Sequence, residues 1–203
     1  SNLLLVWPLI FKNFQLWRVG TCFIFWGRLS FQFLINMLFL YRYSGSLETT
    51  VYEGRTADYV FFLLFSATFM LLSTIFIPMM LLGAGLLSSI IYFWSRKNPN
   101  LVMSFMFGLK FKAIYLPWVL CAFKVLQGGM PIAELIGIVV GHLWYFLVDL
   151  YPLQSGRTLL KTPAILYKFF PSPYGAPVHL QRDPNAPPER GYAWGAGRPL
   201  GQN

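Results

Sequence analysis

Long apolar segments, bounded by charged residues, Pro or Gly, fill most of the chain up to about residue 150. A helix needs about 20 predominantly apolar residues to cross the hydrocarbon core of a bilayer, so segments near this length predict membrane spans. Five segments qualify, although Gly27 and Arg28 interrupt the first. They run from about Val19 to Leu40, from about Tyr59 to Ile77, from the turn at Pro78 to about Trp94, from about Phe111 to Leu126, and from Pro131 to about Leu150.

The composition supports membrane spans. Of the 203 residues, 56% are hydrophobic and 11% are charged, whereas a soluble domain carries about 25% charged residues. Such a chain cannot cover a water-facing surface with charge, and its hydrophobicity excludes disorder over the whole length. The 2 cysteines and the lack of a glycine repeat exclude a disulfide framework and a collagen-like protein. The class that remains is a membrane protein, and the predicted spanning helices make it an all-α one.

Basic residues are distributed unequally between the two sides of the predicted spans. Five crossings place the segment before Val19 and the tail after Leu150 on opposite sides, and twelve of the 16 Lys and Arg residues fall on the tail side. Cytosolic flanks of membrane proteins are enriched in Lys and Arg, so we expect a multi-pass protein with a cytosolic C-terminus. Topology then explains the net charge of +9, and a nucleic-acid partner is not expected.

The chain divides into four predicted regions. Residues 1–18 form a non-cytosolic, interfacial loop, and residues 19–157 form the transmembrane domain. Residues 158–170 have apolar positions at near-helical spacing, so they form either an amphipathic helix on the membrane surface or a loose juxtamembrane linker. Residues 171–203 contain seven Pro and five Gly, which predicts a disordered cytosolic tail.

The last predicted span combines small and ionisable residues. Gly137 and Gly141 form a GxxxG motif, which favours close packing against another helix. Glu134 and His142 are ionisable residues inside a span and are therefore candidates for function. Lys124, on the preceding span, lies at about the height of Glu134, so a structural ion pair between the two is the competing interpretation.

A second set of candidates lies in and before the first predicted span. Gln32 and Asn36 are four residues apart, which places them on one face of a helix, where they would turn inward to find hydrogen-bond partners. Trp17 and Arg18 precede the span. Because Trp favours the interface and Arg reaches phosphates, a loop dipping into the headgroup region is one interpretation, and an ordinary aromatic belt is the other.

Several short motifs together resemble one family. They are the Trp-Arg pair, the segments 40–44, 54–59 and 115–118, and the GxxxG motif followed by His142. This combination is similar to the Derlin family, the rhomboid-like pseudoproteases of the endoplasmic reticulum membrane, over essentially the whole chain. The resemblance implies a rhomboid-like bundle of six transmembrane helices with cytosolic termini and a lumenal loop at 1–18. Because the chain starts at Ser1 without an initiator Met, we expect a truncated N-terminus, with the five spans being the second to sixth.

The resemblance also predicts whether the protein is a protease. Active rhomboids pair a serine in a Gly-x-Ser-Gly turn with a histidine one turn before the GxxxG motif, because serine is a weak nucleophile without an adjacent base. Here Glu134 occupies the histidine position, and Gly83 lies near the serine position. Gln32 and Asn36 keep the spacing of the oxyanion-stabilising His-xxx-Asn, with Gln in place of His. We therefore expect no enzymatic activity.

Two other classes of function are the alternatives. An intramembrane serine protease with a displaced dyad would use Ser88 or Ser89 as its nucleophile. The second histidine of the chain, His179, lies in the predicted disordered tail and cannot supply the base. A small solute transporter predicts an inverted repeat, which the sequence does not show. The two cysteines fall inside spans without a metal-ligand pattern, so we expect neither a metal nor another cofactor.

The end of the tail carries a candidate partner-binding motif. Trp194 and Leu200 are apolar anchors, and Gly195 and Gly197 let the backbone lie against a partner. The motif is similar to the one by which Derlins recruit the hexameric ATPase valosin-containing protein, with Trp194 in place of the usual Phe. A low-complexity tail without a partner is the alternative interpretation.

The resemblance implies a non-catalytic role in endoplasmic-reticulum-associated degradation. A Derlin would assist retrotranslocation of misfolded proteins through a polar cavity formed by Gln32, Asn36 and His142. Predicted spans of only about 16 to 19 apolar residues would thin the bilayer locally. Expected partners are membrane lipids, the ATPase, a ubiquitin-ligase complex of the endoplasmic reticulum and misfolded clients; homo- and hetero-oligomers are both compatible with the resemblance.

Overall fold

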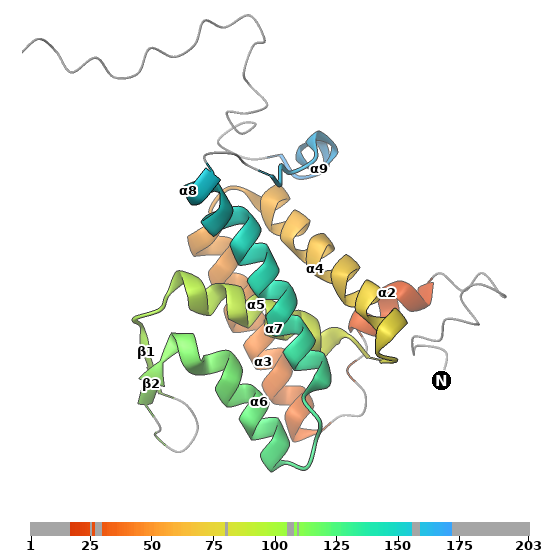
Figure 1. The fold of residues 1–203 in the computed structure, drawn as a ribbon, viewed down its shortest axis with the longest axis vertical. Helices are drawn as coiled ribbons and strands as arrows, with labels where there is room; N and C mark the ends of the chain where they lie inside the picture. The colour runs from red at the N-terminus through yellow and green to blue at the C-terminus, as the bar shows by residue number, and fades with distance from the viewer. Residues whose placement is uncertain are drawn as a thin grey trace, which may run out of the picture.

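The structure is a computed structural model that describes residues 17–24, 26, 30–79, 81–104, 108, 110–155 and 159–171. These residues form a bundle of tilted helices with a short hairpin at its side (Figure 1), which confirms the predicted all-α class. The helices are α2 Trp17–Ile24, α3 Phe31–Ser46, α4 Thr56–Phe76, α5 Gly83–Lys97, α6 Leu116–Leu126, α7 Ile132–Tyr145, α8 Tyr151–Ser155 and α9 Ala164–Phe169. The π-helical turns η1 Leu47–Val51 and η4 Phe146–Leu150 extend α3 and α7, and the 3-10 turn η3 Ala113–Tyr115 precedes α6.

The segment predicted as the first span, residues 19–40 with an interruption at Gly27 and Arg28, is not one helix, because α2 and α3 are separate. Ser30 begins the second of them. Its backbone is extended, and its Oγ accepts a hydrogen bond of 3.2 Å from the N–H of Phe33. This bond satisfies one of the donors that the first turn of a helix leaves unpaired. α3 then continues to Ser46, beyond the predicted end of the span.

The predicted start of the fourth span at Phe111 is also wrong. Phe111 lies in an antiparallel hairpin, formed by β1 Val102–Ser104 and β2 Lys110–Lys112, in which it faces Met103. The helix begins only at Leu116, with Pro117 in its first turn, where a missing N–H costs nothing.

Helix length differs widely among the predicted spans. Within the described part of the chain, two helices are long and apolar enough to cross a membrane: α4, with 21 residues, and the 24-residue helix from Ile132 to Ser155 that comprises α7, η4 and α8. Helix α3 has 16 residues and is extended by the 5 residues of η1, whereas α5 and α6 have 15 and 11 residues. At about 1.5 Å per residue, α6 is about 17 Å long, against a hydrocarbon core of about 30 Å.

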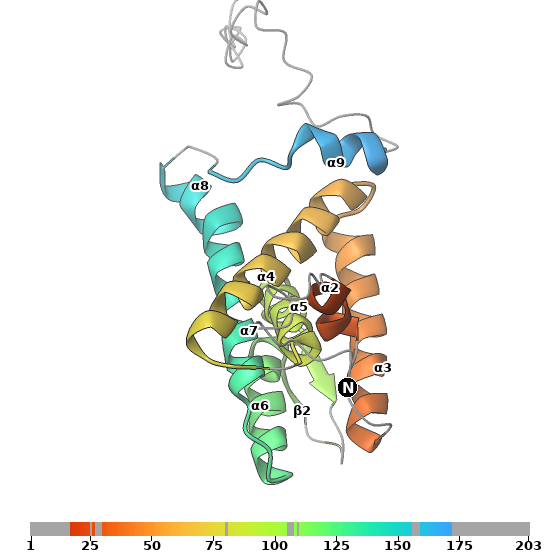
Figure 2. The same cartoon turned by 90° about the vertical axis from the view of Figure 1, so that its right-hand side faces the viewer.

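α5 is the central helix, and α7 packs along it (Figures 1 and 2). All residues of α5 from Leu87 to Ser95 are buried. Small residues permit the close contact with α7. A Cβ on Gly137 would lie 2.0 Å from the carbonyl oxygen of Gly85, and a Cβ on Gly141 would lie 2.9 Å from that of Ser89. The GxxxG motif therefore serves helix packing, the role that the sequence favoured.

Aromatic side chains form the core between α4, α5 and α7. The centroid of the Phe62 ring lies 5.3 Å from those of Phe93 and Trp144. Trp144 Nε1 donates a hydrogen bond of 3.1 Å to the hydroxyl of Tyr52, so the polar atom of the buried indole is satisfied. This core fixes α7 against α4 near the end of the bundle where α7 passes into α8.

Residues 159–171, which we call the strap, contain α9 and lie across the beginning of α4 (Figure 2). Asp58, in the first turn of α4, accepts a hydrogen bond of 2.6 Å from the Thr162 hydroxyl and another from the Tyr167 hydroxyl. Burial, assisted by the bond to Asp58, raises the pKa of Tyr167 to about 12. Of the two interpretations of this segment, the structure shows a helix, limited to Ala164–Phe169 and tied to α4.

Candidate functional site

Polar side chains from three helices line a cavity of about 210 Å³ inside the bundle, which we call the polar cavity. Gln32 and Asn36 come from α3, Lys124 from α6 and Glu134 from α7, while Gly83 of α5 forms part of the wall. Four of these residues were compared with an active rhomboid in the sequence analysis. Asn36 keeps the rhomboid residue, whereas Gln32, Gly83 and Glu134 differ from it. The fold therefore brings together residues that are about 100 positions apart.

Gln32 and Asn36 face each other along one side of α3. Gln32 Nε2 donates a hydrogen bond of 2.9 Å to Asn36 Oδ1, as the four-residue spacing allows. Gln32 Oε1 is buried and has no hydrogen-bond partner within the described part of the chain. An unpaired buried acceptor is costly, so this oxygen is available to a donor that enters the polar cavity.

Lys124 and Glu134 form an ion pair that joins α6 to α7. The turn between the two helices contains Gly128, whose φ of 78° favours glycine. The pair is largely shielded from solvent, since the side chains are 29% and 11% exposed. The structural interpretation of these charges is therefore the observed one. Glu134 Oε2 is buried and has no hydrogen-bond partner among the described residues.

The polar cavity has no Ser-His pair among the described residues. Ser88 lines a small adjoining space of about 30 Å³, and no described histidine lines either space. Ser89 is fully buried and donates a hydrogen bond of 2.8 Å to the carbonyl of Leu86. The titratable side chains that line this space with Ser88, Lys124 and Glu134, form an ion pair with each other. The arrangement suits the binding of polar groups better than nucleophilic attack.

His142 does not line the polar cavity, contrary to the expectation from sequence. It lies near the C-terminal end of α7, two turns beyond Glu134, and its Nδ1 is 2.8 Å from the Tyr92 hydroxyl. The same hydroxyl accepts a hydrogen bond of 2.9 Å from Arg96 Nε. Because a residue eight positions along a helix lies about 12 Å away, His142 and Glu134 cannot share a site of this size.

The Trp-Arg pair begins α2 and does not form a loop. Trp17 is 57% exposed, whereas Arg18 is 3% exposed. The exposed indole agrees with either interfacial interpretation of Trp17, but a buried guanidinium is a structural contact rather than a group that reaches phosphates. The four residues of the tail motif, Trp194, Gly195, Gly197 and Leu200, lie outside the described residues.

Charged residues at the other end of the bundle were not singled out from the sequence. Lys97 Nζ and Asp149 Oδ1 form an ion pair of 2.7 Å between α5 and η4. Tyr52 lies beside them, and burial raises the pKa of its hydroxyl. The motif at 54–59 marked this region only as part of the family pattern. Among the described residues, no group of His, Cys, Asp and Glu is arranged to hold a metal ion.

Comparison with known proteins places the whole arrangement in one family. The model of the Der1-like family matches residues 1–164. Derlin-1 of Homo sapiens is 40% identical over 212 aligned positions, which cover 98% of this chain and 84% of the relative. Derlin-2 of Oryza sativa subsp. japonica is 36% identical, over 93% of this chain and 79% of the relative. As its motifs predicted, the chain belongs to the Der1-like family, the Derlins.

Proposed function

We propose that this Derlin is a non-catalytic component of endoplasmic-reticulum-associated degradation and assists the retrotranslocation of misfolded lumenal and membrane proteins. The content of the polar cavity is the observation that supports the proposal most directly. By the family resemblance, Glu134, which is paired with Lys124, occupies the position of the base of an active rhomboid, and Gly83 lies near the position of its nucleophile. A cavity that keeps amide and charged groups without that dyad favours contact with a polypeptide over its cleavage.

The polar cavity lowers the cost of holding polypeptide backbone inside the bilayer. Each unpaired peptide group in hydrocarbon costs several kcal/mol. The amides of Gln32 and Asn36 both donate and accept hydrogen bonds, and Gln32 Oε1 offers an open acceptor. The short helix α6, which exposes Trp118, Val125 and Leu126, supports the second part of the mechanism, a bilayer that is locally thinned to match it.

The tail supplies the link to the cytosol in this proposal. The protein is a multi-pass protein of the endoplasmic reticulum membrane with its C-terminus in the cytosol. Trp194, Gly195, Gly197 and Leu200 recruit the valosin-containing hexameric ATPase, which supplies the pulling force. A ubiquitin-ligase complex of the same membrane and misfolded clients complete the set of partners. Family membership and the excess of Lys and Arg on the tail side support this topology.

The cavity half of the proposal is tested with client turnover in cells that lack the endogenous protein. We expect the double variant Gln32→Leu and Asn36→Leu to slow the degradation of a misfolded lumenal reporter, while Gln127→Leu, at the exposed end of α6, does not. A labelling experiment with a serine-reactive fluorophosphonate accompanies it. Labelling that is lost in Ser88→Ala or Ser89→Ala would establish an intramembrane protease and refute the non-catalytic role.

The tail half is tested by affinity purification from detergent extracts. Trp194→Ala combined with Leu200→Ala should abolish co-purification of the ATPase. The matched control removes one aromatic residue and one leucine elsewhere in the tail, as Tyr174→Ala and Leu180→Ala, and should retain the ATPase. Equal recovery with both double variants would show that the tail motif is not the binding site.

A further inference from the structure

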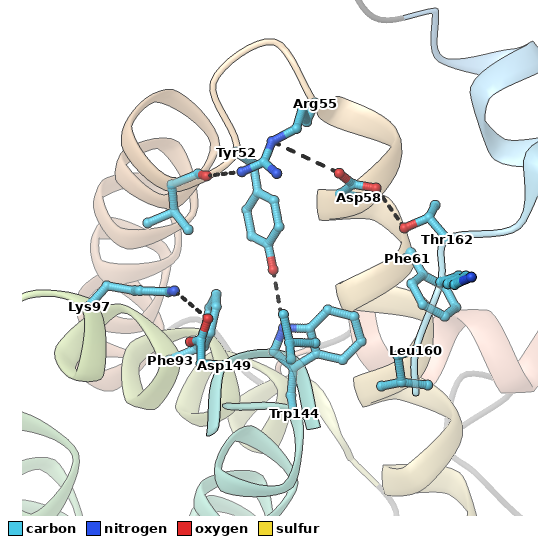
Figure 3. Close-up of a pocket in the computed structure, with 13 residues that line it drawn as sticks. Tyr52, Arg55, Asp58, Phe61, Phe93, Lys97, Trp144, Asp149, Leu160 and Thr162 are labelled. Carbon is cyan, nitrogen blue, oxygen red and sulfur yellow. Dashed lines mark hydrogen bonds and ion pairs between the residues drawn. The ribbon is translucent and has the colours of Figure 1, made fainter. Parts of the chain in front are cut away.

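A second cavity, of about 400 Å³, lies at the opposite end of α7 from the polar cavity (Figure 3). Its walls come from the loop before α4, the ends of α5 and α7, and the strap, so we call it the strap pocket. Its volume falls within the range of about 300–1,000 Å³ typical of ligand sites. The strap closes one side of it with Leu160, Lys161 and Thr162.

The charges of the strap pocket do not cancel. Lys97 is paired with Asp149 at 2.7 Å, and Arg55 lies 4.0 Å from Asp58. Lys161 also lines the pocket, and within the described part of the chain no carboxylate lies within ion-pair distance of it. Three cations and two carboxylates leave one positive charge, which complements a ligand with a single negative charge.

The floor of the strap pocket is aromatic and rigid. The rings of Tyr52, Phe93 and Trp144 are each at most 6% exposed and pack against one another or against Phe62. Tyr52 and Trp144 are also joined by a hydrogen bond (Figure 3). The apolar edges that these rings present to the pocket suit the C–H groups of a ring-shaped polyol, and the neighbouring carboxylate oxygens accept hydrogen bonds from its hydroxyls.

An apolar groove of about 340 Å³ continues from the strap pocket along α4. Phe61 lines both spaces, and the strap lines the pocket with residues 160–162 and the groove with residues 163–166. On α4 the groove extends through Phe65 to Phe69, about 12 Å further along the helix. Because α4 is one of the two helices long enough to span a bilayer, this direction leads from its end toward the hydrocarbon core.

We propose that the strap pocket and the groove together bind one molecule of phosphatidylinositol. The phosphodiester lies near Lys161 and Arg55, the inositol hydroxyls face the carboxylates of Asp58 and Asp149, and one acyl chain follows the groove past Phe65. Phosphatidylserine would place a third carboxylate against those two aspartates. Phosphatidylcholine has neither the hydroxyl donors nor the net charge. The site is independent of the proposed function of the polar cavity.

The test is photo-crosslinking in nanodiscs of phosphatidylcholine that contain the full-length protein. The probe is phosphatidylinositol with a diazirine on one acyl chain, competed by unlabelled lipids of matched chains with inositol, glycerol, serine, choline or ethanolamine head groups. Water-soluble glycerophosphoinositol separates head-group binding from binding of the whole lipid. We expect labelled peptides from α4 and the strap, and competition by phosphatidylinositol above all others.

Variants of the pocket and a matched control complete the test. Lys161→Gln removes the charge without a carboxylate partner and should lower labelling about five-fold, and Arg55→Gln should lower it further. Lys168→Gln removes a lysine of the same strap that does not line either space, and should label like the unchanged protein. Labelling that all head groups compete equally, that Lys161→Gln leaves unchanged, or that maps outside α4 and the strap would overturn the proposal. The size-exclusion elution volume and the thermal melting temperature of each variant distinguish a loss of lipid binding from misfolding.

Discussion

Substitution of Gly137 tests the close contact between α5 and α7. A Cβ at this position would lie 2.0 Å from the carbonyl oxygen of Gly85, whereas ordinary contacts begin at 3.4 Å. The obstacle is the backbone of a buried helix, which cannot rotate away as a side chain can. α5 and α7 must therefore separate by more than about 1 Å, and the packing between them loosens along its length.

The size of the effect follows from the contacts. Overpacking that side chains can absorb costs about 1–3 kcal/mol, so we expect Gly137→Ala to lower the free energy of unfolding by about 3 kcal/mol or more. Gly141→Ala meets the carbonyl of Ser89 at 2.9 Å and should cost about 1 kcal/mol. Gly45→Ala, in helix α3, meets nothing within 4 Å. It should stabilise by about 0.5–1 kcal/mol because alanine loses less backbone entropy.

The assay is equilibrium unfolding in mixed micelles with rising mole fraction of sodium dodecyl sulfate, followed by tryptophan fluorescence and far-ultraviolet circular dichroism. The three variants should rank in the order Gly45→Ala, Gly141→Ala, Gly137→Ala, from most to least stable. A stability of Gly137→Ala equal to that of Gly45→Ala would show that α5 and α7 do not approach as closely as described. The unchanged protein provides the reference for all three.

Further predictions concern the ion pair and the strap. Glu134→Leu leaves Lys124 without its partner and should cost about 2–3 kcal/mol, less than the 3–5 kcal/mol of a fully buried pair, and adding Lys124→Met should restore most of it in a double-mutant cycle. Asp58→Ala removes the acceptor of Thr162 and Tyr167 and should speed tryptic cleavage at Lys161 and Lys168 about ten-fold, for a loss of about 1.5 kcal/mol, whereas Glu53→Ala in the loop before α4 should not. The pKa of Tyr167 is raised from 10.0 to about 12, so the folded strap keeps a proton that the free strap loses; docking should persist below pH 10 and weaken between pH 10 and 12. The rate at which an alkali-tolerant protease cleaves the strap, compared with the rate in Tyr167→Phe, measures this loss of docking. A cleavage rate that does not change between pH 10 and 12 would contradict the role given to the Tyr167 hydroxyl.

The polar cavity could be predicted from the sequence in those parts that depend on local geometry. Residues four apart on a helix share a face, which predicted that Gln32 and Asn36 turn inward together; the hydrogen bond between them is a finding of the structure. Lys124 and Glu134 lie on either side of a short glycine turn, so their contact required only that two helices reverse direction. Neither inference needed knowledge of which helices are neighbours in space.

The features that could not be predicted depend on contacts between distant segments. The strap is held by bonds from Asp58 to residues 104 and 109 positions away, and no periodicity in either segment specifies them. The family resemblance implies that His142 lines the polar cavity, but its partner in the structure is Tyr92, 50 residues earlier. In the sequence, only Gly27 and Arg28 mark the break between α2 and α3. Ser30, whose side chain caps the first turn of α3, does not stand out in the hydropathy pattern.

Helices α5 and α6 are both short and apolar, but α5 is buried in protein whereas α6 is exposed. This difference indicates where the proposed thinning of the bilayer would occur. α5 is short and apolar, but its residues from Leu87 to Ser95 are buried in protein and do not set the height of the surrounding lipid. α6 is shorter still, and it exposes Trp118, Val125 and Leu126. A bilayer deforms to match the apolar length of the helices that it touches. The bilayer should therefore be thinnest beside α6. Because Lys124 of α6 lines the polar cavity, the thinnest part of the bilayer would lie next to that cavity.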